Sequence, residues 1–111
     1  MRRIPEKGDI FLVCLDPVVG TEINKTRPGV IVSNNIGNRF SSRVIVAPVT
    51  SNVKNIFPFQ VYIDDIVQKP SKILVDQIRT VDKIRLVKYF GQLCAEKLIE
   101  IDNSLKIVFD I

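Results

Sequence analysis

Arg27 stands where a polar loop meets an apolar run, and the carboxylate of Glu22 precedes it in the same loop. An arginine and a carboxylate on a loop between strands are typical of a site for an anionic substrate, because a guanidinium can hold two phosphate oxygens in its planar fork. A salt bridge between Arg27 and Glu22 would be the ordinary structural explanation, and the residues alone favour neither interpretation.

The chain has 111 residues and no histidine, which removes most acid–base chemistry. Its Asp and Glu residues are scattered, so neither a zinc site nor a carboxylate site for magnesium has the ligands it needs. Ser and Cys lack a histidine base, and no glycine-rich phosphate loop is present. What remains is chemistry in which the substrate supplies the nucleophile, as RNA does with its ribose 2′-hydroxyl. We therefore expect no metal and no other cofactor.

Thr50 is a second candidate, because it ends an apolar run and begins the polar run 51–55. Its hydroxyl could face a cleft and bind a phosphate oxygen, although a strand-end threonine that caps a turn is the more ordinary interpretation. Attack by a 2′-hydroxyl builds negative charge around phosphorus, and Arg27 is suited to stabilise that charge.

The elements that must position these residues are mostly β-strands. Apolar runs alternate with clusters of Gly, Pro, Asn and Ser, and they predict strands over residues 10–15, 29–33, 43–50, 59–63, 73–78 and 87–93. The first run is apolar on both faces and is expected to be central, whereas Pro48 suggests an edge strand or a bulge. Residues 34–38 are rich in turn formers. Helical spacing then predicts a C-terminal amphipathic helix with an apolar face of Leu98, Ile101, Leu105 and Val108.

Short strands followed by one helix predict an α+β fold on a small, strongly twisted antiparallel barrel, with residues 1–111 as a single domain. The net charge of +4 favours polyanionic partners. Cys14 and Cys94 are expected to be buried, reduced thiols. No stretch approaches the ~20 apolar residues of a membrane span, and no secretory leader is evident, so we expect a cytoplasmic protein without membrane contact.

A further group of basic residues near the last predicted strand indicates either a solvated face or a groove that follows an RNA backbone: Lys83, Arg85 and Lys88.

Nearly the whole chain carries short motifs in a specific order and spacing, at residues 7–10, 16–22, 27–28, 35–40, 46–51 and 76–82. Together they resemble the MazF/PemK family of toxin endoribonucleases from bacterial toxin–antitoxin systems. The resemblance implies an SH3-like barrel, a homodimer, and metal-independent, sequence-specific cleavage of single-stranded RNA (mRNA), neutralised by a cognate antitoxin protein. Ile23 departs from the glutamine that is common in the family, so the preferred RNA sequence is expected to differ.

The resemblance also assigns roles to residues. Family catalytic positions fall on Arg27 and Thr50, and the RNA-binding positions, to which we add Ser51 beside Thr50, are Thr21, Glu22, Phe57, Pro58 and Gln77. Arg27 would stabilise the transition state and Thr50 would orient the phosphate. The proton of the 2′-hydroxyl would pass to Glu22, to water, or to an arginine that gives up its own proton inside the site. The products would be a 2′,3′-cyclic phosphate, which can open to a 3′-phosphate, and a 5′-hydroxyl end.

Two other functions fit the same sequence. A toxin of the same barrel could bind a protein target such as DNA gyrase without cutting RNA, although Arg27 and Thr50 together speak against it. A non-catalytic RNA-binding module is the third interpretation, and only a measurement of activity separates it from the first.

Overall fold

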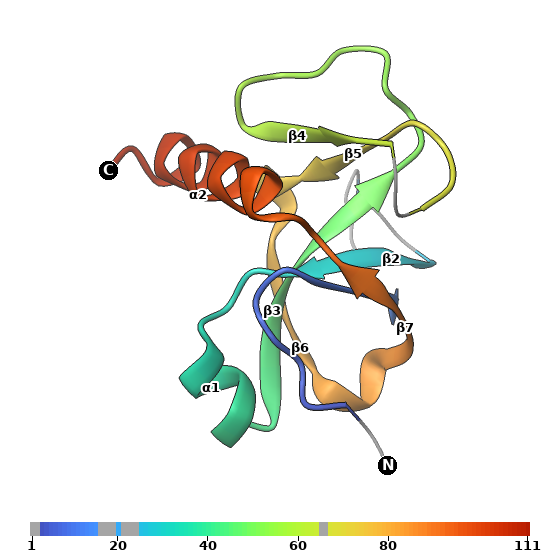
Figure 1. Ribbon diagram of the computed structural model, residues 1–111, viewed down its shortest axis with the longest axis vertical. Coiled ribbons are helices and arrows are strands. Elements are labelled where there is room, and N and C mark those ends of the chain that lie inside the picture. The colour runs from blue at the N-terminus through green and yellow to red at the C-terminus, as the bar shows by residue number, and fades with distance from the viewer. Residues whose placement is uncertain (1–2, 16–19, 21–24, 65–66) are drawn as a thin grey trace.

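The computed structural model describes residues 3–15, 20, 25–64 and 67–111. Within them the strands come first and the long helix last (Figure 1), which confirms the predicted α+β class. The elements are β1 Asp9–Cys14, β2 Thr26–Ile31, α1 Asn35–Phe40, β3 Arg43–Thr50, β4 Gln60–Ile63, β5 Ser71–Leu74, the 3₁₀ turn η1 Val75–Gln77, β6 Arg79–Asp82, the 3₁₀ turn η2 Lys83–Arg85, β7 Leu86–Gln92 and α2 Ala95–Phe109.

The described strands form one antiparallel sheet in the order β4-β5-β3-β2-β1-β7, and β6 also pairs with β3. On one side β3 therefore has two partners in succession: β6 along residues 43–46, then β5 at residues 49 and 50. The sheet changes direction where β3 passes from one partner to the next, so β4 and β5 lie at one end of the molecule and β6 and β7 extend toward the other (Figure 1).

Two apolar cores lie on opposite faces of β1, because its side chains alternate. Ile10 joins Val30, Ile73 and other residues on the face that α2 covers, whereas Phe11 and Val13 belong to a second cluster. The prediction that the first strand is central is confirmed, since β1 lies between β2 and β7.

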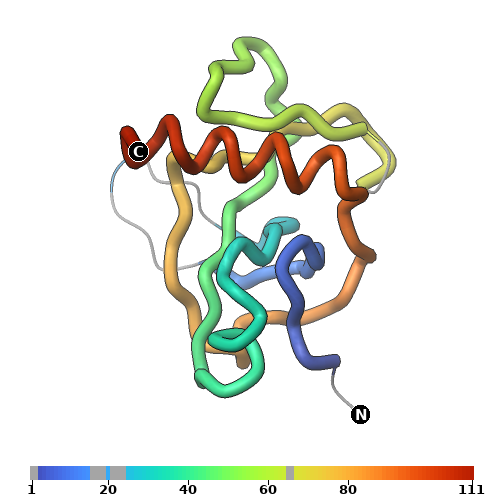
Figure 2. Tube along the Cα trace, turned by 60° about the vertical axis from the view of Figure 1, so that its left-hand side comes forward, coloured from blue at the N-terminus to red at the C-terminus, as the bar shows by residue number. Residues whose placement is uncertain are grey.

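The predicted amphipathic helix is confirmed as α2, which crosses the strands in Figure 2. Ile101 is fully buried, and the other residues of the predicted apolar face pack around the same core: Leu98, Leu105 and Val108. None of the helices in the described part of the chain is long and apolar enough to cross a membrane.

Residues 34–38 were expected to be turns, but most of them belong to the short helix α1. The side chain of Asn34 accepts a hydrogen bond from the backbone N–H of Gly37 at 2.7 Å, as an N-cap residue does. Asn38 is fully buried and donates to the carbonyl of Ser33 at 2.9 Å. The same residue types favour turns and helix caps, and this ambiguity explains the error.

Pro48 does not mark an edge strand, because β3 is internal to the sheet. The Val32 N–H donates to the Ile45 carbonyl, so odd-numbered backbone groups of β3 face β2 and even-numbered ones face the opposite side. On that opposite side the β6 pairing ends at Val46 and the β5 pairing begins at Val49. The missing N–H of Pro48 faces this interval, where an internal proline is tolerated.

The strand predicted over residues 73–78 is in fact divided. β5 ends at Leu74, η1 follows, and β6 begins at Arg79, outside the predicted range. The turn lets the chain leave β4 and return along the first half of β3, and the fully buried side chain of Val75 anchors it. An apolar run alone does not reveal such a break, because strand and turn residues are buried in the same core.

Both cysteines are free thiols, and neither is fully buried: Cys14 is half-buried. Cys94 is exposed at the N-cap position of α2, ahead of the buried face of the helix, so the prediction of two buried thiols is wrong.

Candidate active site

A cleft of about 380 Å³ brings several of the predicted site residues together. Arg27, Thr50 and Ser51 line it, with Lys25, Thr26, Pro28, Val49, Val67, Lys69 and Ser71. The pairing of β2 with β3 explains the proximity. The β2–β3 pairing ends where Gly29 is opposite Pro48, and Arg27 and Thr50 each lie two residues beyond this last pair. Residues two apart on a strand project to the same face, so both side chains can reach one group bound in the cleft.

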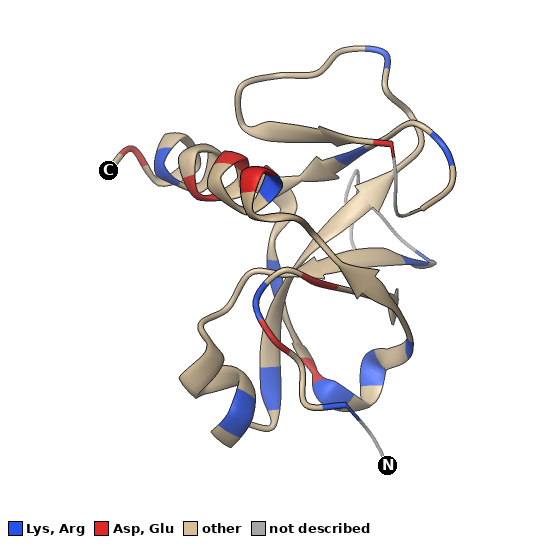
Figure 3. Cartoon of the chain, in the orientation of Figure 1, with Lys and Arg blue, Asp and Glu red and all other residues tan. Residues whose placement is uncertain are grey.

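The described cleft is positively charged. Its charged lining residues are Lys25, Arg27 and Lys69, with no carboxylate among the described lining residues. The basic segments at the start of β2 and between β4 and β5 lie on one side of the molecule in Figure 3. Positive charges that line a concave surface attract a polyanion. Among the described residues, no three Asp, Glu or Cys side chains gather closely enough to hold a metal ion.

Arg27 is half-buried and is held on β2, where it pairs with Val13 of β1. The predicted loop residues Thr21 and Glu22 lie outside the described residues. The described part of the site thus contains the guanidinium and its strand, which are the parts needed to hold phosphate oxygens.

Thr50 is also half-buried, and its hydroxyl oxygen accepts a hydrogen bond from the backbone N–H of Asn52 at 3.2 Å. A hydroxyl has one proton and two acceptor sites, so this bond leaves the proton of Thr50 available to a ligand. The two interpretations of Thr50 are therefore compatible: it caps the turn, and its hydroxyl can still donate into the cleft.

Lys69 and Ser71 line the cleft but were not predicted as site residues. Ser71 begins β5, and its hydroxyl donates to the Lys69 carbonyl at 3.1 Å, which ties the residues before β5 to the strand. They reach the cleft because β5 pairs with the end of β3 that carries Thr50. Lys25, on the opposite side, has a φ of 67°, a left-handed conformation that is uncommon for lysine.

Three more predicted RNA-binding residues are described by the structure and lie outside this cleft: Phe57, Pro58 and Gln77. Phe57 is 48% exposed, and its ring stacks on Phe59 with centroids 5.3 Å apart. Ser104 of α2 donates to the carbonyl of Pro58 at 3.1 Å, and Gln77 lies in η1, which also contacts α2. The predicted set is therefore divided between the cleft and the surface near α2.

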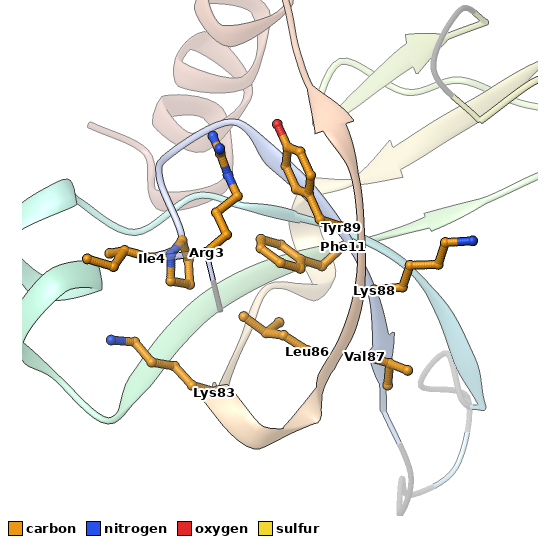
Figure 4. Close-up of a pocket in the computed structure, with 9 residues that line it drawn as sticks. Arg3, Ile4, Phe11, Lys83, Leu86, Val87, Lys88 and Tyr89 are labelled. Carbon is orange, nitrogen blue, oxygen red and sulfur yellow. The ribbon is translucent and has the colours of Figure 1, made fainter. Parts of the chain in front are cut away.

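A second cavity, of about 360 Å³, lies between the N-terminal segment and β7 (Figure 4). Its residues include Phe11 and Leu86, and the guanidinium of Arg3 lies 4.3 Å from the centre of the Tyr89 ring. Hydrogen bonding to the buried Asp9 carboxylate raises the pKa of Arg3. This arginine is thus fixed by the fold and charged.

The predicted basic group is divided between this cavity and the end of β1. Lys83 and Lys88 line the second cavity. Arg85 instead donates to the Cys14 carbonyl at 3.2 Å, and Arg79 donates to the Leu15 carbonyl at 2.7 Å. These two arginines therefore hold the chain where β1 ends.

Comparison with known proteins identifies the family of the chain. Residues 6–109 match the family model described as "PemK-like, MazF-like toxin of type II toxin-antitoxin system". The chain belongs to this toxin family. Among curated relatives, Endoribonuclease MazF of Staphylococcus epidermidis is 43% identical over 91% of this chain and 88% of its own length. Endoribonuclease MazF9 of Mycobacterium tuberculosis is 36% identical, covering 95% and 96% of the two chains.

Solved MazF structures share the fold. MazF from Deinococcus radiodurans superimposes with a TM-score of 0.87 over 99% of this chain and 100% of its own, at 23% identity. A mycobacterial endoribonuclease in complex with its cognate antitoxin gives 0.79 over 96% of each chain, at 22% identity. At this level of identity the likeness concerns the fold.

Proposed function

We propose that this MazF-like chain, as a single toxin domain over residues 1–111, is an endoribonuclease that cleaves single-stranded RNA. The observation that carries the proposal is the cationic cleft beyond the end of the β2–β3 pairing, which Arg27 and Thr50 line together. The names of the curated relatives, Endoribonuclease MazF and MazF9, support the same reaction. Unpaired RNA is favoured because its bases can be splayed out and bound.

Cleavage would be sequence-specific and would need no metal. The ribose 2′-hydroxyl attacks the neighbouring phosphorus, the P–O5′ bond breaks, and the leaving 5′-oxygen takes a proton from water. The products carry a 2′,3′-cyclic phosphate, which water can open to a 3′-phosphate, and a 5′-hydroxyl. Arg27 stabilises the charge that develops on the phosphate oxygens, and the Thr50 hydroxyl donates to one of them. The 2′-hydroxyl proton passes to water or to Glu22, because a guanidinium is a poor base.

The remaining contacts with RNA would come from Thr21, Glu22, Ser51, Phe57, Pro58 and Gln77. We further propose a cytoplasmic homodimer that a cognate antitoxin neutralises, its acidic segment competing with RNA for the cations of the cleft. The structures of the mycobacterial endoribonuclease with its cognate antitoxin and of MazE-MazF from Deinococcus radiodurans support an antitoxin partner.

A substrate with a single modified sugar tests this function. The wild-type protein is incubated with a long unstructured RNA, its cut sites are mapped, and an oligonucleotide spanning one site is then made with 2′-deoxyribose at the cut. The proposed reaction requires the all-ribose oligonucleotide to be cleaved and the modified one to resist. Equal cleavage of the two would rule out attack by the 2′-hydroxyl, and no cleavage of any RNA would contradict the endoribonuclease assignment.

A further inference from the structure

One cross-strand row of residues extends beyond the cleft. Thr50 of β3 is paired with Lys72 of β5, and Lys72 is paired with Tyr62 of β4. The adjacent row, Val49, Ile73 and Val61, is buried in the core that α2 covers. Because successive side chains alternate between faces, Thr50, Lys72 and Tyr62 project to the opposite face, which Arg27 shares.

The side chain of Lys72 is buried although it carries a charge. Only 8% of the residue is exposed, and its ammonium donates to the backbone carbonyl of Asn55 at 2.8 Å. Within the described residues, no carboxylate pairs with this ammonium. A buried charge is costly unless hydrogen bonds compensate it, so the Asn55 carbonyl is the partner that holds Lys72 in this position.

Asn55 belongs to the connection 51–59, which arches from the end of β3 to the start of β4 in Figure 1. The far end of this connection has its own anchors: the Phe57 N–H donates to the Gln60 side chain at 3.2 Å, and Ser104 holds the Pro58 carbonyl. Near Thr50 the connection has only local turn bonds, those of Asn52 and Lys54 within the described residues. Within the described residues, the hydrogen bond from Lys72 thus joins the middle of the connection to the sheet.

We propose that Lys72 is a positioning residue that determines which RNA sequence is cut. It holds the connection 51–59 in one position relative to the cleft. The base that stacks on the exposed Phe57 ring is then separated from the phosphate at Thr50 by a fixed length of RNA. This role rests on the proposed RNA cleavage. It assigns sequence selection to a buried lysine that does not line the cleft and does not touch the reacting atoms.

The test compares Lys72→Met, which keeps an unbranched stem but removes the charged donor, with Lys72→Arg, which restores a donor. Lys106→Met, at an exposed position on α2, is the control for loss of one positive charge. Hydrogen exchange of the free protein reports the connection 51–59, and the ratio of cleavage at preferred and non-preferred sites in one RNA reports selection. A purely stabilising residue would change the melting temperature and leave that ratio unchanged.

In Lys72→Met we expect amides of the connection to exchange about tenfold faster, equivalent to ~1.4 kcal/mol. The preference ratio should fall by about the same factor, with KM changing more than kcat. Lys72→Arg should recover most of both, and Lys106→Met should match the wild type. Unchanged exchange in Lys72→Met, or faster exchange with an unchanged preference ratio, would overturn the inference while leaving the function intact. If the wild type cut no RNA, the proposed function would fail first, and the role of Lys72 in it would fail with it.

Discussion

The hydroxyl oxygen of Thr50 accepts the backbone N–H of Asn52 at 3.2 Å, at the point where β3 ends beside the cleft. This bond fixes the rotamer of Thr50 and leaves its proton free for a phosphate oxygen. The turn after the strand and the proposed hydrogen bond to the substrate therefore depend on the same oxygen. Substitutions of Thr50 can separate the effect of its methyl group from the effect of its hydroxyl.

We expect Thr50→Val to lower the rate of RNA cleavage by about 100-fold or more, because it removes a donor to the developing charge. Its cost to the free energy of unfolding should be only about 0.5–1.5 kcal/mol, the net value of one hydrogen bond. Single-turnover cleavage and urea unfolding measure the two effects. Thr50→Ser is the matched control and should keep most of the rate; a Ser variant as slow as Val would argue that the methyl group, not the hydroxyl, matters.

Lys69 should contribute to RNA affinity through charge alone, since it is exposed and lines the cleft. Neutralising one phosphate contact on a single strand lowers the slope of log K against log salt concentration by about 0.7. We therefore expect Lys69→Met to bind RNA more weakly at low salt and with a slope smaller by that amount. Fluorescence anisotropy across a salt series measures the slope.

The control for Lys69 is again Lys106→Met, which has the same formal charge and lies on α2. If the two variants showed the same slope, Lys69 would act only through the net charge of the protein, and its place in the cleft would have no consequence for binding.

Gly8→Ala should destabilise the fold by about 1–3 kcal/mol, because it adds backbone strain to a close contact. Gly8 has a φ of +92°, and a Cβ there would lie 2.7 Å from the Leu98 side chain of α2. Gly20→Ala is the control, since Gly20 also has a positive φ, of +62°, with nothing within 4 Å of an added Cβ. Urea unfolding of both variants separates the cost of the contact with Leu98 from the cost of backbone strain. Equal losses of unfolding free energy in the two variants would mean that Leu98 moves aside without cost.

Periodic patterns in the sequence predicted the elements that have one solvated face. Val61 and Ile63 alternate with half-exposed neighbours in β4, and the helical spacing of Leu98 and Ile101 continues through α2. The pattern failed where one residue type serves two purposes. Asn34 favours a turn in isolation, but in the structure its side chain caps α1 by accepting the Gly37 N–H.

The candidate site was predictable only in part, for a geometric reason. Motifs in the sequence indicated Arg27 and Thr50, but their meeting in one cleft depends on the pairing of β2 with β3, which no local pattern contains. Lys69 lies in the cleft because β5, which begins two residues later, pairs with the end of β3. The sequence did not reveal this pairing, because the predicted strand over 73–78 overlaps β5 only at residues 73 and 74 and ends before β6.

The most direct test of the account is cleavage of a long unstructured RNA by the purified protein in EDTA, with Arg27→Ala beside the wild type. The wild type should give discrete cuts in the chelator, and the variant should lose at least about 100-fold in rate, since it lacks the group that stabilises the transition state. Circular dichroism should show both proteins folded. Cleavage that EDTA abolishes, or that Arg27→Ala performs at the wild-type rate, would contradict the central claim.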